Sequence, residues 1–289
     1  MEDSEFPPQI TEKNDIIVSL PEVFKRANLD YTRLILSYGD CGNIENAREI
    51  TAEDYLNFAK ADFSETAQDR GRVNAITNAK RAIDCQIDDI LFSLGCDLKK
   101  NLPNITQKIA DSFCDDETKK LLNPTPKLAL IAALNISPMT IIAETRALRN
   151  AVEHYYIIPD KKAVRKAIEI AEMFIAATKM KFINSQNFSL RDTRQKTKGH
   201  WARKNEIVIH RPYSTGLFFD EISYWYFEGT KLTKWIYPLN LNDETYWLAI
   251  RMAFSFDSEP IFRPTFSRLL QLAEVNIPYD KIKYKLSID

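Results

Sequence analysis

The chain has 289 residues, with 39 Lys and Arg, 40 Asp and Glu, and a formal net charge of −1. A hydrophobic content of 45% and a charged content of 27% are typical of a globular protein with one large domain or two ordinary ones. The near-neutral charge excludes a polycation, so nucleic-acid binding would require a local basic patch. No apolar stretch is long enough to span a bilayer, and the acidic start Met1-Glu2-Asp3 is unlike a secretory signal, so we expect a cytoplasmic protein without membrane contact.

Residues that often bind metals or cofactors are sparse. The four cysteines are Cys41, Cys85, Cys96 and Cys114, and only three His residues occur. No two cysteines have a two-residue spacing, which predicts reduced thiols and neither a disulfide framework nor a zinc site. No Gly-rich phosphate loop, dinucleotide fingerprint or Gly-x-Ser-x-Gly elbow is present. We therefore expect no cofactor and no metal.

Residues 1–50 have a mixed texture. Ile16-Ile17-Val18 and Leu34-Ile35-Leu36 are short apolar runs, and residues 38–43 indicate a turn or loop. We interpret this part as an N-terminal extension, either a packed segment or a short hairpin.

A helical pattern begins at Thr51, whose hydroxyl caps a predicted helix over residues 51–63. The longest periodic segment follows over residues 67–95 and ends at Gly95. Its apolar seam consists of Val73, Ile76, Ile83, Ile87, Ile90 and Leu94. Lys80 occupies the remaining seam position. Such a seam requires another helix against it, from this chain or from a second copy.

Further helices are predicted over residues 102–122, 127–134, 138–158 and 160–182. Pro138 and Asp160 begin the last two. Short connections join these segments, which predicts an antiparallel helical bundle over residues 51–184. The acidic groups Asp88-Asp89 and 115–117 lack metal-ligand partners, and we expect them to be solvated.

After residue 184 the pattern becomes alternating and aromatic, which predicts a β-rich C-terminal domain over residues 185–289. Strand-like runs occupy residues 206–209, 217–227, 232–239, 246–256 and 282–288. Residues 228–231 predict a hairpin turn, and residues 265–275 predict a helix. The fold class expected is therefore α+β, with a helical bundle followed by a β-rich domain.

A basic stretch over residues 191–204 joins the two parts. Its cations are Arg191, Arg194, Lys196, Lys198, Arg203 and Lys204, against Asp192 alone. Trp201 lies among them. Basic residues interleaved with an aromatic ring are suited to an RNA backbone, although a solvated loop has the same composition.

The motif segment, residues 145–156, carries the residues best suited to chemistry. On a helical wheel at about 100° per residue, its apolar side collects Ile141, Thr145, Leu148, Val152 and Tyr155. Its polar side holds Arg146, Arg149, Asn150, Glu153, His154 and Tyr156. A merely solvated face would more simply consist of Lys and Glu, so this arc indicates a site.

RNA cleavage by the 2′-hydroxyl requires a base, an acid and a cation, but no metal. His154 is suited to proton transfer near neutral pH, and Arg149 is suited to holding phosphate oxygens. Their axial separation on a helix is about 7.5 Å, within reach of one phosphodiester. Their angular separation of about 140° is wide, and a second copy of the helix would add groups from the other side.

These residues resemble the signature of the HEPN superfamily, in which Arg, a polar residue, a spacer and His lie near a helix end. Arg149, Asn150 and His154 match it, with a spacer of four residues counted from Arg149, and Tyr156 matches the His-x-Tyr ending of toxins in HEPN–nucleotidyltransferase pairs. Residues 78–84 are similar to first helices of prokaryotic HEPN proteins. The resemblance covers about residues 51–182.

The resemblance implies a homodimeric helical bundle with metal-independent endoribonuclease activity at the dimer cleft. Arg149 would stabilise the phosphate and His154 would act as base or acid. Asn150 would orient groups, while Glu153 and Tyr156 would support them, with Tyr156 also a site of modification by a partner enzyme. Arg146 and the basic stretch would contact RNA, and an antitoxin or an anti-phage defence protein would be the partner.

Two alternatives remain open. In one, the chain is a non-catalytic HEPN module that dimerises and binds RNA or a partner through its C-terminal domain. In the other, Arg149, Glu153 and His154 form ordinary surface pairs on a structural helix. The C-terminal domain resembles no family that we can name.

Overall fold

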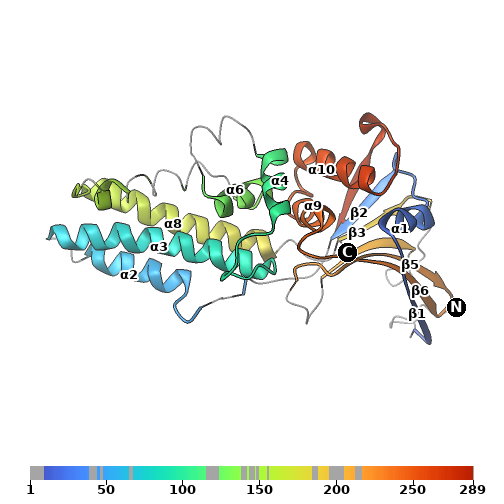
Figure 1. Cartoon of the computed structure of the whole chain (residues 1–289), viewed down its shortest axis with the longest axis horizontal. Coiled ribbons are helices and arrows are strands. Elements are labelled where there is room, and N and C mark those ends of the chain that lie inside the picture. Colours follow the sequence, from blue (N-terminus) through green and yellow to red (C-terminus); the bar gives the residue numbers. More distant parts are fainter. Residues whose placement is uncertain are drawn as a thin grey trace. The chain divides into compact units, whose positions relative to one another are not determined.

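The computed structural model describes residues 10–38, 44–45, 48–64, 68–114, 124–137, 142, 147, 150–154, 156–183, 188–194, 205–211 and 217–288. The chain forms two compact units (Figure 1). The helical unit consists of residues 43–183, and the sheet unit combines residues 1–42 with residues 184–289. We describe each unit separately.

The described helices of the helical unit are α2 (Ala52–Ser64), α3 (Asp69–Ser93), α4 (Asn104–Phe113), α6 (Pro126–Ala133) and α8 (Lys161–Ile183). Lys60 near the end of α2 pairs with Glu172 at 2.7 Å, whereas Glu53 near its start pairs with Lys179. These pairs show that α2 runs antiparallel to α8. The amide of Gln86 on α3 donates to the Thr178 hydroxyl of α8 at 2.9 Å in the interior.

The seam of α3 is covered within the chain. Ile76, Ile83 and Ile90 are completely buried, and α3 contacts α2, α6 and α8. The helix predicted over residues 67–95 is therefore confirmed, with its partner helices supplied by the same unit. Lys80 does not interrupt the core, because its ammonium pairs with Asp84 one turn along the helix.

The sheet unit contains β1 (Glu12–Ile17), α1 (Leu20–Ala27), β2 (Leu34–Tyr38), β3 (Phe188–Asp192), β4 (Glu206–His210), β5 (Glu221–Glu228), β6 (Lys231–Pro238), α9 (Glu244–Ala253), α10 (Glu259–Leu272), the short 3₁₀ helix η1 (Tyr279–Lys281) and β7 (Tyr284–Ile288). Its seven strands lie in the order β1-β6-β5-β4-β3-β2-β7. β1 is parallel to β6 and β7 is parallel to β2, while the other neighbours are antiparallel.

The mixed α+β class is confirmed, but the order of its parts differs from the expectation. Residues 1–50 do not form a separate extension before the bundle, because β1 and β2 belong to the sheet. The helical unit is inserted in the sequence between β2 and β3. The pairing of β1 with β6 joins residues far apart in the sequence, so no local pattern indicated it.

The strand expected over residues 246–256 is wrong, since residues 246–253 lie in α9 and residues 254–256 form the turn after it. Asp243 caps the helix by accepting a hydrogen bond from the Thr245 backbone N–H at 2.9 Å. Every residue from 245 to 253 is buried, so the helix shows no polar stripe and its aromatic start resembles a buried strand. The hairpin turn at residues 228–231 is confirmed, with Gly229 at a φ of 61° between β5 and β6.

The sheet has one apolar and one polar face. The Phe262 ring of α10 lies 5.9 Å from Phe188 of β3 and 4.9 Å from Tyr284 of β7. The Arg26 guanidinium of α1 lies over Trp235 of β6, which the register places on the same face. Both helices therefore cover the apolar face, as Figure 1 shows. Alternate residues of each strand form the polar face.

Candidate functional site

The motif segment is described at Ala147, at 150–154 and at Tyr156. Residues 150–154 are helical, as is Ile142 just before the segment, and the side chains of Ile142 and Val152 are buried. Asn150 and His154 are exposed and Glu153 is half-buried. The helix thus buries the side that carries Val152 and presents Asn150 and His154 to solvent. Arg146 and Arg149 lie outside the described residues.

Tyr156 does not belong to the helical arc on which the wheel placed it. Its φ is 54° and its side chain is 88% exposed, so the right-handed helix has ended before it. A helix also cannot continue comfortably into Pro159, which is buried three residues later. Tyr156 therefore lies on the chain that leaves the helix, beside the exposed Ile157 and Ile158.

Two hydrogen bonds hold the short connection between the motif segment and α8. Arg72, in the first turn of α3, donates a hydrogen bond of 3.0 Å to the Pro159 carbonyl. Asp160 then caps α8, accepting a hydrogen bond of 2.7 Å from the Ala163 backbone N–H. The same contacts place the beginnings of α3 and α8 together, so these two helices run parallel rather than antiparallel.

Cations gather at this end of the helical unit. The first turn of α3 and the first two turns of α8 carry Arg70, Arg72, Lys161, Lys162, Arg165 and Lys166. Asp69 pairs with Arg72, and Asp160 is used as the helix cap. Lys161 and Lys162 are exposed, leaving a local excess of positive charge beside the end of the motif segment. These cations are not among the site residues predicted above, although the run from residue 161 to 166 indicates a basic helix start.

The basic stretch is partly built into the sheet unit. The Arg194 side chain donates two hydrogen bonds to Oδ2 of Asp192, from Nε at 2.9 Å and from Nη2 at 2.5 Å, and Nη2 also donates to the Asn28 carbonyl. The Arg194 backbone N–H donates to the other carboxylate oxygen, Oδ1, at 2.9 Å. Burial raises the pKa of Asp192, but hydrogen bonds from Arg194 and from the Asp30 backbone N–H outweigh it and lower that pKa overall. Arg194 thus has a structural partner, while its side chain stays about half exposed, and the RNA contact expected for it remains a prediction.

Arg191 is also not part of a linker. It lies in β3 on the polar face of the sheet and is only 8% exposed. The other cations of the stretch, Lys196, Lys198, Arg203 and Lys204, lie outside the described residues, as do His200 and Trp201.

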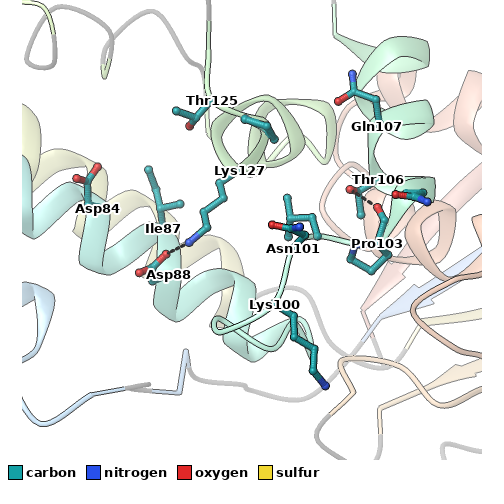
Figure 2. Close-up of a pocket in the computed structure, with 13 residues that line it drawn as sticks. Asp84, Ile87, Asp88, Lys100, Asn101, Pro103, Thr106, Gln107, Thr125 and Lys127 are labelled. Carbon is teal, nitrogen blue, oxygen red and sulfur yellow. Dashed lines mark hydrogen bonds and ion pairs between the residues drawn. The ribbon is translucent and has the colours of Figure 1, made fainter.

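A cavity of about 740 Å³ opens in the helical unit between α3, α4 and the beginning of α6 (Figure 2). Its lining is mixed, with the amides of Asn101, Asn104 and Gln107 and the hydroxyls of Thr106 and Thr125. The volume lies within the range of small-molecule sites. The charged groups of the lining are already neutralised by neighbours, so they do not identify a ligand.

Asp88 is the centre of that neutralisation. Its carboxylate pairs with Lys127 of α6 at 2.7 Å and with Arg48, as Figure 2 shows for Lys127. The expectation that Asp88-Asp89 is solvated is wrong, because Asp88 is 9% and Asp89 2% exposed. Burial, together with the charge of Asp89, raises the pKa of the nearby Cys85 thiol to about 12.

The described residues contain no cluster of three or more His, Cys, Asp or Glu side chains that would hold a metal ion. Cys85, Cys96 and Cys114 are buried and form no disulfide among the described residues, while Cys41 lies outside them. The described helices include no candidate for a membrane span, since each is too short or too polar.

Comparison with known proteins gives no relative: no family model, no curated protein and no solved structure matches the chain.

Proposed function

We propose that the chain is a metal-independent endoribonuclease of the HEPN type, with its motif in the helical unit. The observation that supports this best is the exposed pair Asn150 and His154 on a helix whose Val152 side is buried. An imidazole and an amide presented together to solvent suit a polar substrate better than a structural role. Arg149, which completes the motif in the sequence, extends the proposal beyond the described residues.

In this proposal the 2′-hydroxyl of RNA attacks the adjacent phosphorus. A bond forms between the 2′-oxygen and phosphorus, and the bond from phosphorus to the 5′-oxygen breaks. His154 accepts the hydroxyl proton or donates one to the leaving oxygen, and Arg149 stabilises the charge on the phosphate. Asn150 orients the phosphate by hydrogen bonding, and Glu153 supports His154. The products carry a 2′,3′-cyclic phosphate and a 5′-hydroxyl.

The cations at the beginnings of α3 and α8 favour RNA as the substrate. No acidic residue lies among residues 161–168, which include Lys161, Lys162 and Arg165. Arg72 is held by its hydrogen bond to Pro159, close to the motif segment. Phosphate contacts of this kind supply affinity without sequence preference and weaken as salt rises. Arg146 would add a further contact in the same region.

The proposal includes partners that the HEPN resemblance implies. A second copy of the helical unit would complete the cleft, and an antitoxin or another defence protein would restrain the activity. Tyr156, which is 88% exposed, is accessible to a modifying partner. The buried free thiols suit the reducing conditions of the cytoplasm, where we place the reaction.

The test is RNA cleavage by purified protein in buffer that contains a chelator. Arg149→Ala and His154→Ala are expected to lower cleavage by at least 100-fold with unchanged folding. His210→Ala, the same substitution in the sheet unit, is the matched control and should retain activity. Cleavage by His154→Ala at the wild-type rate would exclude the mechanism.

A 2′-deoxy substitution at the scissile nucleotide separates this chemistry from other nuclease mechanisms. It should block cleavage there, because the nucleophile is removed. A protein that binds RNA, yet cuts none of a broad set of RNAs, would instead be the non-catalytic module.

A further inference from the structure

The polar face of the sheet carries cations and hydroxyls where β3, β2 and β7 lie side by side. Phe188 and Tyr284 contact Phe262 on the apolar face, so the residues next to them project from the polar face. The group formed there, which we name the cradle, consists of Arg191, Lys285, Ser37, Ser189 and Ser287.

Strand register arranges the cradle in two rows. In one row Ile35 of β2 lies between Arg191 of β3 and Lys285 of β7. In the next row Ser37 lies between Ser189 and Ser287. Neighbouring strands are about 4.8 Å apart, so the two cations start about 10 Å from each other, and the rows are about 7 Å apart. Long cationic side chains can therefore converge over the hydroxyls.

Among the described residues, Arg191 is a buried cation without an ion pair. It is 8% exposed, and its Nε is buried without a hydrogen-bond partner. Glu206 follows on β4 along the same register, but no ion pair between Glu206 and Arg191 is present among the described residues. A guanidinium held in this way costs several kcal/mol unless an anion compensates it. An anionic ligand would remove that cost.

The other buried cation of the polar face shows how this chain satisfies such a charge. Lys234 of β6 is 9% exposed, pairs with Glu221 at 3.3 Å and lies 4.4 Å from the Trp225 ring centroid. Arg191 has no comparable arrangement among the described residues. An arginine with a purely structural role would be paired as Lys234 is, whereas an arginine that binds a ligand lacks a partner when the ligand is absent.

Ser37 adds a second unsatisfied group next to Arg191. It is 2% exposed, and its hydroxyl is buried without a hydrogen-bond partner. Lys285 is exposed, whereas Ser189 and Ser287 are half-buried, so solvent reaches the cradle from the β7 side. Hydroxyl donors and two cations on one face of a sheet are groups that can bind a tetrahedral oxyanion.

We propose that the cradle binds a phosphoryl group, carried either by an RNA backbone or by a free nucleotide. The guanidinium of Arg191 donates to two phosphate oxygens, Ser37 donates to a third, and Lys285 adds charge from the open side. A carboxylate has too few oxygens to occupy all these donors. The cradle belongs to the sheet unit, so this inference stands without the ribonuclease proposal.

The experiment measures binding to the full chain at constant ionic strength. The probes are inorganic phosphate, a nucleoside monophosphate and a single-stranded 2′-O-methyl RNA, which has no nucleophilic hydroxyl and so reports binding without cleavage. Arg191→Gln should weaken the tightest-bound probe at least tenfold. Arg33→Gln, which removes an exposed guanidinium that pairs with Asp30 in the same unit, is the control and should bind as the wild type.

Stability without ligand gives an independent readout. Arg191→Gln and Arg191→Met should unfold at the wild-type temperature or above it, because they remove an uncompensated buried charge. Ser37→Ala and Lys285→Gln should each weaken binding several-fold while leaving the guanidinium in place. Preference for RNA over both small probes would assign the phosphoryl group to a backbone, and the reverse would assign it to a nucleotide.

Two results would overturn the inference. One is wild-type affinity of Arg191→Gln for all three probes. The other is a clear loss of unfolding temperature in both Arg191 variants without ligand, because that would make Arg191 a satisfied structural cation.

Discussion

Arg72 donates a hydrogen bond of 3.0 Å to the backbone carbonyl of Pro159 and so joins the first turn of α3 to the chain that follows the motif segment. Arg72 is also paired through Nη2 with Asp69, while Nη1 makes the bond to Pro159. Pro159 itself is buried. The position of His154, five residues earlier, therefore depends on a residue far away in the sequence.

Replacing Arg72 should loosen this connection without removing any group from the proposed chemistry. In Arg72→Ala, we expect faster hydrogen exchange of amides 150–158 and a loss of about 1–2 kcal/mol in unfolding free energy. The rate of RNA cleavage should decrease as these amides lose protection from exchange. Arg70→Ala, an exposed neighbour with the same charge, is the control, and equal exchange in the two variants would contradict the positioning role.

The hydrogen-bonded carboxylate of Asp192 should make the stability of the sheet unit fall at acidic pH. Hydrogen bonds lower its pKa in the folded chain, so its ionised form stabilises the fold. The contribution is complete above the unfolded pKa of about 3.9 and disappears as pH falls through the lower folded pKa. Asp192→Asn should cost about 1–3 kcal/mol at pH 7, as measured by denaturant unfolding. The difference from wild type should shrink below about pH 4, and a constant difference would contradict the assignment.

The helices with a clear polar side and several strands were predictable, whereas the order of the strands in the sheet was not. Helix α3 was predicted from the spacing of Ile76, Ile83 and Ile90. This spacing is a local sequence pattern, and all three side chains are buried in the folded chain. In contrast, β1 gives no burial signal, because all six of its residues are exposed at an edge of the sheet. Helix α9 resembles a strand in the sequence because it is buried on every side and therefore has no polar stripe.

The candidate site was only partly predictable for a similar reason. Asn150 and His154 follow from one helical wheel, but Tyr156 departs from it because Pro159 ends the helix nearby. The bond between Arg72 and Pro159 joins residues 87 positions apart, which no local pattern specifies. Likewise, the basic composition of residues 191–204 concealed that Arg191 is buried and Arg194 paired.

Native cysteines should resist alkylation. Burial raises the pKa of Cys85 to about 12 and that of Cys96 to about 11, so few thiolates exist at pH 8. We expect both to react with iodoacetamide at least 100 times more slowly in the folded chain than in denaturant, as followed by peptide mass spectrometry. Rapid labelling of the native chain at Cys85 would show that its surroundings open readily.

Ile83 tests whether the α3 seam belongs to the monomer. Its side chain is completely buried, so Ile83→Ala should cost about 2–5 kcal/mol of unfolding free energy. Val73→Ala at the half-buried beginning of the seam should cost clearly less. Because α2, α6 and α8 already cover the seam, neither variant should change the molecular mass in solution. A shift from dimer to monomer in folded Ile83→Ala would instead place a second copy against α3.

The buried carboxylate Asp88 should be worth more to the helical unit than either of its cations. Asp88→Ala leaves Lys127 and Arg48 without an anion, but both cations are partly exposed and can be hydrated, so we expect a loss of about 1–3 kcal/mol. Lys127→Ala leaves Asp88 with Arg48 and should cost less. In the double variant Asp88→Ala with Lys127→Ala, the loss should be smaller than the sum of the single losses, because the removed groups interact directly at 2.7 Å. Strictly additive losses in urea unfolding would mean that the ion pair between Asp88 and Lys127 contributes nothing to the free energy of unfolding.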